Sequence, residues 1–374
     1  MKIYNLILIG LLFSVCACTQ TPSKKTIIKK PTNVILLIAD GTGLSQISSA
    51  FFYKDSTPNY ARFKNIGLIK TSSSQQLITD SAAGATAFAC GIKTYNGAIA
   101  VADDSTHVKT LIELVAPKNI KTGLIATSSI THATPASFFA HSSSRNNAQE
   151  IASYLPKSSI DFFAAGGIKH FNKRDDKQDL LETFVQNGVH IDTTALATFS
   201  SIKSFSKAGY LLAEDHMKSV TNGRGDFLSK ATNLGIEFLS KDTDNPNFFL
   251  MVEGSQVDWA GHSNDGDYLV SELIDFDDAV GIALDFAEKD GNTLVVVTAD
   301  HETGGFTLGS TAKKTAEGKA YNDYNELNMM FSTHGHSATL VPVFAYGPGS
   351  ENFKGVYENT AIFDKIMEVT AWNK

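Results

Sequence analysis

The chain has 374 residues, of which 43% are hydrophobic, and its formal net charge is −7. This length and composition suffice for one large domain or two ordinary ones with a sizeable core. A negative chain without a basic stripe is poorly suited to hold nucleic acid electrostatically, so small or metal-bound partners are favoured.

The N-terminus predicts an export signal. After one lysine, an apolar run over residues 6–15 is too short to cross a bilayer as a helix. Residues 15–18, VCAC, resemble a bacterial lipobox, so we interpret residues 1–17 as a lipoprotein-type signal peptide and Cys18 as the lipidated residue. Residues 18–31 would then be a tether. We expect an exported protein in the periplasm or a lipoprotein at the outer membrane or cell surface.

Residues 32–374 show no repeat or linker and are expected to form a single catalytic domain. Apolar, β-branched runs of strand length occur at 33–40, 121–129, 248–254, 292–301 and 340–347. Segments with helical spacing occur at 110–118, 268–289 and 360–372. Strands buried on both faces that alternate with helices predict an α/β fold, a three-layer α/β/α sandwich around a large, mainly parallel central sheet.

Two polar stretches interrupt this pattern. Residues 146–223 are expected to decorate the sheet without forming a separate domain. Residues 311–328 read as an insert that forms a small crown over the site.

Acidic residues and a histidine follow three predicted strands: Asp40, Glu253, Asp300 and His301. In open α/β sheets, ligands bind at the carboxyl ends of the strands, so these side chains are expected to share one crevice as a metal site. The alternative is that loops after strands are simply polar.

Further candidate ligands lie in two other segments. Asp258 and His262 are four residues apart, which puts both side chains on one face of a helical turn, although two surface residues give the same pattern. The segment THGHS offers His334 and His336, and either could be a solvated loop histidine. Mixed Asp/His sets suit Zn²⁺, whereas oxygen sets with Glu and Thr suit Mg²⁺.

Residues 79–98, TDSAAGATAFACGIKTYNGA, predict the start of a helix. Asp80 is a good N-cap and alanine is the best helix former, so Ser81 would lie in the first turn. Free backbone N–H groups there favour an anionic phosphate. On this segment alone, Ser81 could equally be a second capping residue.

This segment resembles the nucleophile motif of the alkaline phosphatases, and further motifs of that family follow in order between residues 33 and 349. They are ADG around Asp40, THATPASFFAHSSSR (131–145), VEGSQVDWAGH (252–262), TADHETGG (298–305) and HSATLVPVFAYGPG (336–349). The resemblance implies a homodimer that hydrolyses small phosphate monoesters, with broad specificity, through a phosphoserine.

Carried over by position, the resemblance implies two Zn²⁺ and one Mg²⁺ per chain. The ligands would be Asp258, His262 and His336 for the first zinc, Asp40, Asp300 and His301 for the second, and Asp40, Thr134 and Glu253 for magnesium. Ser81 would be the nucleophile and Arg145 would hold two phosphate oxygens, with Asp80 orienting its guanidinium.

The sequence departs from the best-known enterobacterial pattern at two positions, where His132 stands for an Asp and Trp259 for a Lys. This pair resembles the short, cold-adapted bacterial type. His132 would reach magnesium through water or become a direct ligand under excess zinc. Trp259 cannot offer a charge to phosphate, and packing at the rim is as good an interpretation as a substrate-facing role.

Two other functions fit part of this pattern. A phosphodiesterase of the same metallo-superfamily would also use two zinc ions and a hydroxyl, but Arg145 favours monoesters because it binds a charged oxygen that a diester replaces. A sulfatase would carry a Cys- or Ser-x-Pro-x-Arg core, which is missing at residues 81–85. A non-catalytic, metal-stabilised binding lipoprotein would have lost a ligand or the nucleophile, and no such loss is visible.

Overall fold

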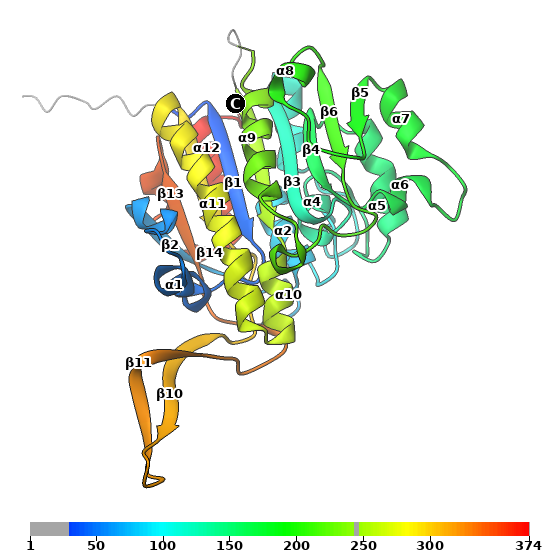
Figure 1. Ribbon diagram of the computed structural model, residues 1–374. Helices are drawn as coiled ribbons and strands as arrows, with labels where there is room; N and C mark the ends of the chain where they lie inside the picture. Colours follow the sequence, from blue (N-terminus) through cyan, green and yellow to red (C-terminus); the bar gives the residue numbers. More distant parts are fainter. Residues whose placement is uncertain (1–29, 243–246, 374) are drawn as a thin grey trace, which may run out of the picture.

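The computed structural model describes residues 30–242 and 247–373. The predicted signal peptide, nearly all of the tether and Cys18 lie outside the described residues. A ten-stranded sheet forms the centre, in the order β14, β2, β13, β8, β1, β7, β3, β4, β6, β5 (Figure 1). Strand β13 runs antiparallel to both of its neighbours, and the other pairs in this sheet are parallel. The predicted mainly parallel α/β sheet is therefore confirmed.

The strands of this sheet are β1 (Asn33–Ala39), β2 (Asn65–Lys70), β3 (Lys121–Ser129), β4 (Phe162–Gly166), β5 (Val189–Asp192), β6 (Lys207–Leu211), β7 (Phe248–Gly254), β8 (Thr293–Thr298), β13 (Val341–Tyr346) and β14 (Gly355–Glu358). The five predicted strands are present as β1, β3, β7, β8 and β13. The polar stretch 146–223 does more than decorate the sheet, because it contributes β4, β5 and β6 to one edge. These strands have only five, four and five residues, too few for a clear apolar run.

Helices cover both faces of the sheet: α1 (Leu44–Tyr53), α2 (Ser81–Cys90), α3 (Leu111–Val115), α4 (Ala133–Ala136), α5 (Ala148–Tyr154), α6 (Lys169–Asn172), α7 (Leu180–Gln186), α8 (Phe199–Ile202), α9 (Phe227–Leu239), α10 (Gln256–Ser263), α11 (Gly266–Asp290) and α12 (Ala361–Thr370). The predicted helices at 110–118, 268–289 and 360–372 correspond to α3 with a short 3₁₀ turn, α11 and α12. Within the described ranges, no helix has both the length and the apolar character needed to cross a membrane.

Alternate side chains of β1 enter two separate cores. Val34, Leu36 and Ile38 pack on one face with α2, α3 and α12, whereas Ile35, Leu37 and Ala39 pack on the other with α9, α10 and α11. Since successive side chains of a strand point to opposite faces, the strand is buried on both sides. This arrangement is the α/β/α sandwich that the sequence predicts.

An antiparallel hairpin, β10 (Thr307–Lys314) and β11 (Ala320–Met330), projects from the body (Figure 1, orange). The predicted insert 311–328 falls within it. On either side of the hairpin in the chain, β9 (Glu302–Thr303) pairs with β12 (His336–Ser337). This short ladder returns the chain to the carboxyl end of β8 and places His336 there.

Candidate active site

Helix α2 begins at Ser81, with Asp80 as its N-cap. Asp80 has extended backbone (φ −98°), and its Oδ1 accepts a hydrogen bond of 3.0 Å from the Ala83 N–H. The cap is therefore supplied by Asp80, as predicted, and the Ser81 hydroxyl is left for another role. Ser81 is buried, and its Oγ lies 3.2 Å from His301 Nε2.

Asp40, Asp300 and His301 meet where the neighbouring strands β1 and β8 end. His301 Nε2 lies 3.6 Å from Asp40 Oδ1 and 3.3 Å from Asp300 Oδ2. These three ligand atoms are close enough to hold one ion. Gly41, at φ +75°, turns the chain away from β1, and a Cβ there would lie 2.5 Å from the Asp258 Cα. Only glycine allows this approach.

A second group combines α10 with β12. His262 Nε2 lies 3.4 Å from Asp258 Oδ1, and His336 Nε2 lies 3.1 Å from His262 Nε2 and 3.6 Å from Asp258 Oδ1. The structure thus brings together the three residues predicted to share an ion. His301 is also within ligand distance of Asp258 and His336, so the two groups adjoin.

The other ring nitrogen of each of these histidines is held by a hydrogen-bond partner. The Nδ1 atoms contact the His334 carbonyl (2.5 Å, from His262), the Thr79 carbonyl (2.8 Å, from His336) and Thr303 Oγ1 (3.1 Å, from His301). Such contacts fix the ring orientation of ligating histidines and turn Nε2 toward the ion. They also separate two candidates: His336 turns its ring into the site, whereas His334 supports His262 through its backbone.

A third group contains Asp40, His132 and Glu253, whose ligand atoms could also hold one ion. Glu253 Oε2 accepts hydrogen bonds from Ser128 (3.2 Å) and Ser255 (2.7 Å). Its Oε1 is buried without a hydrogen-bond partner.

Several buried oxygens of the cluster have no hydrogen-bond partner: both carboxylate oxygens of Asp40, Asp300 Oδ2, Glu253 Oε1 and Thr134 Oγ1. Burial, reinforced by the charges of Asp300 and Asp258, raises the pKa of Asp40 well above its usual range. Burial likewise raises the pKa of Glu253 to about 7. Unpaired buried acids are costly unless cations neutralise them, so this donor set fits divalent metal ions.

Arg145 lies beside the start of α2. Its NH1 donates to Asp80 Oδ2 at 3.0 Å, and the same oxygen accepts from the Gly97 N–H at 3.0 Å. Burial disfavours the Asp80 carboxylate, but the hydrogen bond from Ala83 and the charge of Arg145 outweigh it and lower its pKa. Asp80 therefore stays ionised and holds the Arg145 guanidinium beside the start of α2.

His132 and Trp259 lie next to this guanidinium. His132 Nε2 is 3.3 Å from Arg145 NH2, and burial, together with the charge of Arg145, lowers the pKa of His132 to about 3. The Trp259 ring meets His132 edge-on, with centroids 5.8 Å apart, and His216 at 4.6 Å. Trp259 is half-buried, so it packs against the site and also reaches its rim.

Four supporting residues were not predicted: His216, Thr303, Ser128 and Ser255. Thr303 Oγ1 donates to Asp258 Oδ1 at 2.5 Å, and His216 Nδ1 accepts from the Ser129 N–H at 3.0 Å. Thr303 lies inside the TADHETGG motif and Ser255 inside VEGSQVDWAGH, so these motifs could have indicated both residues as supports of the site. Nothing in the sequence around His216 indicates its place beside Trp259.

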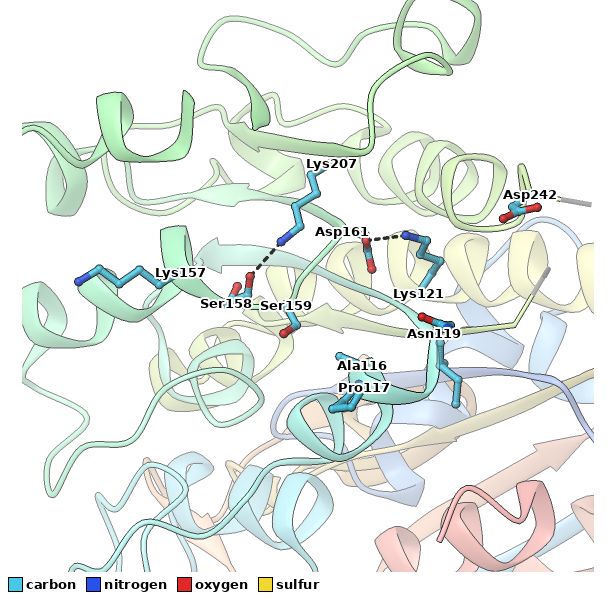
Figure 2. Close-up of a pocket in the computed structure, with 11 residues that line it drawn as sticks. Ala116, Pro117, Asn119, Lys121, Lys157, Ser158, Ser159, Asp161, Lys207 and Asp242 are labelled. Atoms are coloured by element: carbon cyan, nitrogen blue, oxygen red, sulfur yellow. Dashed lines mark hydrogen bonds and ion pairs between the residues drawn. The ribbon is translucent and has the colours of Figure 1, made fainter. Parts of the chain in front are cut away.

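A cavity of about 660 Å³ lies at the amino ends of β3, β4 and β6, away from the carboxyl ends where the acidic cluster lies (Figure 2). Two of its lysines are paired locally: Lys121 Nζ lies 3.1 Å from Asp161 Oδ1, and Lys207 Nζ donates to the Ser158 carbonyl at 3.1 Å. Ligands of open α/β sheets bind at the carboxyl ends of the strands, so this cavity is not the active site.

A buried acid and histidine cluster beside a serine at a helix start, on this sandwich, is typical of a metal-dependent hydrolase. The model of the alkaline phosphatase family matches residues 31–331 and 309–372. The chain therefore belongs to the alkaline phosphatase family and is a hydrolase of phosphate monoesters.

Individual relatives agree. Alkaline phosphatase 3 of Bacillus subtilis is 35% identical, over 91% of this chain and 89% of its own length. The structure of alkaline phosphatase from the Antarctic bacterium TAB5 is 60% identical, with a TM-score of 0.90, over 93% of this chain and 100% of that one. A TAB5 variant with magnesium bound in its M3 site is 62% identical, with a TM-score of 0.91 and the same coverage.

Proposed function

We propose that the chain hydrolyses phosphate monoesters through a phosphoserine at Ser81. The observation that carries this proposal is the Ser81 hydroxyl itself. It is buried at the positive end of α2, 3.2 Å from His301 and beside Arg145, whose guanidinium is held by Asp80. An attacking oxygen and a phosphate-binding cation near the same end of α2 are what this mechanism requires, and these contacts support it.

The reaction takes two displacements at phosphorus. In the first, Ser81 loses its hydroxyl proton to water, the Ser81 Oγ–P bond forms and the P–O bond to the alcohol breaks. The alcohol leaves as it takes a proton from water, so no proton is gained or lost overall. In the second, a water oxygen attacks the phosphoserine, Ser81 regains its proton and inorganic phosphate is released. Arg145 binds two equatorial oxygens in both steps. Two inversions give net retention at phosphorus.

The metal content that we propose is two Zn²⁺ and one Mg²⁺. Asp258, His262 and His336 would hold one zinc, Asp40, Asp300 and His301 the other, and Asp40, Thr134 and Glu253 the magnesium. Bound there, the ions would lower the pKa of the serine hydroxyl and offset the charge of the leaving oxygen. Support for magnesium comes from the M3 site of the TAB5 variant.

On the basis of His132 and Trp259, we propose that the chain is of the short, cold-adapted bacterial type of alkaline phosphatase. His132 remains neutral because of its low pKa and would contact the third metal through water or directly. Broad specificity for the alcohol follows, since catalysis rests on groups that hold the phosphoryl group.

Trapping the intermediate tests the central step. After a quench in acid, the wild-type protein incubated with p-nitrophenyl phosphate should carry phosphorus on Ser81, identified by mass spectrometry. Ser81→Ala should carry none and lose at least about 10³-fold in kcat. Ser48→Ala, at an exposed serine of α1, is the matched control and should behave as wild type. Full activity of Ser81→Ala would remove the proposal, as would faster hydrolysis of a bis-aryl diester than of the monoester.

The remaining proposals concern assembly and location. We propose a homodimer of single-domain subunits, residues 32–374, in which the β10–β11 hairpin forms the small crown. We also propose export as a lipoprotein anchored through Cys18. Light scattering on the purified protein tests the dimer, and palmitate labelling of wild type against Cys18→Ala tests the anchor.

A further inference from the structure

A second cavity, of about 450 Å³, adjoins the active site on the side of α10. Trp259 links the two spaces. Its ring lines the cavity and also lies edge-on to His132, which is 3.3 Å from the Arg145 guanidinium. The rings of His132 and Trp259 thus connect the Arg145 guanidinium to the cavity.

The cavity lies across the sheet from the nucleophile. Helix α2 packs in the core on one face, with Ala82 and Phe88, whereas α10 packs in the core on the other, with Val257 and Ala260. The cavity is lined by α10, the start of α11 and the loop that begins at Met217. In-line displacement places the leaving oxygen opposite the attacking one, so the alcohol would depart toward this side.

The lining combines aromatic surface with negative charge. Trp259 and Tyr268 contribute rings, and Tyr268 is fixed because its hydroxyl donates to Gln256 Oε1 at 2.7 Å. Asp265 and Asp267 are exposed carboxylates at the start of α11. The lining contains no lysine or arginine.

The nearest basic residues do not change this balance. Arg224 is buried and paired with Glu272 and Asp275. Lys218 follows Met217 but is not part of the lining. The cavity therefore presents a net negative surface to whatever enters it.

We infer that this cavity is a leaving-group subsite that favours alcohols bearing a quaternary ammonium group. Aromatic faces attract such cations through their electron-rich surface, and nearby carboxylates add a Coulomb attraction. The inference rests on the proposed monoester hydrolysis. It names a preferred substrate class: phosphate monoesters of cationic alcohols are preferred over neutral ones of equal shape.

Two esters of equal shape test it. Phosphocholine carries the cation, and 3,3-dimethylbutyl phosphate is its neutral counterpart. We expect a several-fold higher kcat/KM for phosphocholine in the wild-type protein. In Asp265→Asn/Asp267→Asn this preference should fall about fivefold, because each exposed carboxylate contributes modestly. Added salt should reduce it in the wild type.

The variants are chosen to keep the fold. Asp265 caps α11 by accepting from the Tyr268 N–H at 3.0 Å, and asparagine caps as well as aspartate. Glu237→Gln, at an exposed carboxylate of α9 that does not line the cavity, is the matched control and should keep the wild-type preference. Trp259→Leu should reduce the preference further. Choline itself should inhibit hydrolysis of p-nitrophenyl phosphate more strongly in the wild type than in the double variant.

An equal preference in the wild type and the double variant would overturn the inference, provided both hydrolyse p-nitrophenyl phosphate. An equal drop in Glu237→Gln would overturn it too, since the effect would then be one of net charge. The proposed function fails separately, through Ser81→Ala, whatever the preference between the two esters.

Discussion

Asp40 and Asp277 are both fully buried carboxylates, yet their surroundings are opposite. Asp277, on α11, binds Lys54 Nζ at 2.5 Å and accepts from the backbone N–H groups of Asn59 (3.0 Å) and Tyr60 (3.1 Å). Neither oxygen of Asp40 has a hydrogen-bond partner. A charge buried for stability thus receives its partners from the chain itself, whereas a charge buried for chemistry is left for a bound cation.

Of the changes that test this comparison of Asp40 with Asp277, removal of metal should have the largest effect, and it should act on catalytic activity. Treatment with EDTA should lower kcat by roughly 10³-fold or more, because several kcal/mol of transition-state stabilisation is lost. Zinc and magnesium added back should restore activity. Elemental analysis before and after should account for the loss, and metal-free protein that works at full rate would contradict our interpretation of Asp40.

Substitution of the two aspartates should then act with opposite signs. In metal-free protein, Asp277→Asn should destabilise the fold by about 3 kcal/mol, because it removes the buried charge that pairs with Lys54 and weakens the acceptor of two backbone N–H groups. Lys54 then keeps only its ion pair with the exposed Asp278. Asp40→Asn should instead stabilise it by about 1 kcal/mol, because it removes repulsion from Asp300 and Asp258. Urea unfolding of both variants measures these differences. If both substitutions change the free energy of unfolding in the same direction, our distinction between Asp40 and Asp277 is wrong.

The pH dependence of Glu253 should give a third effect. In metal-free folded protein its pKa is raised to about 7, so it keeps a proton that the unfolded chain loses above its ordinary pKa. The folded state then binds more protons in this window, and the free energy of unfolding falls as pH rises toward about 7. Between about pH 4.5 and about pH 8, Glu253→Gln should gain on the order of 3 kcal/mol relative to wild type.

Urea unfolding at both pH values measures this gain. Glu237→Gln, on the surface of α9, serves as the control and should follow wild type. A parallel pH profile for wild type and Glu253→Gln would show that Glu253 ionises normally.

The smallest effect is expected from a supporting residue. Thr303 donates to Asp258 and lies 3.1 Å from His301 Nδ1, so it positions ligands of two groups. Thr303→Val keeps the shape and removes the hydroxyl, and it should weaken metal retention about 10- to 100-fold. Competition with a chelator followed by zinc analysis measures this. Thr307→Val, exposed at the start of β10, should retain metal as the wild type does.

The sequence predicted the centre of the sheet and missed its edges. Strands β1, β7 and β8 are buried on both faces, so the chain marks them with long apolar runs. The edge strand β5, with the sequence VHID, buries only one residue fully, so its sequence contains no long apolar run. The Asp80 cap was predictable because it depends only on neighbouring residues.

The candidate site was predictable in its membership but less so in its support. Acids at strand ends and the ordered motifs indicated the three groups of side chains. From spacing alone, His334 and His336 were equivalent. The family motif favoured His336, and the β9–β12 ladder and the contact with the Thr79 carbonyl show how its ring is held toward the site. His216 comes from a loop whose position depends on tertiary packing, which no local pattern encodes.

Asp80 gives one carboxylate two jobs, because one oxygen starts α2 and the other steers Arg145. The stability of the first turn of α2 and the orientation of the proposed phosphate-binding Arg145 therefore depend on the same side chain. Alanine at position 80 would remove both the helix cap and the contact that orients Arg145, whereas asparagine would keep the cap and remove only the negative charge that faces Arg145.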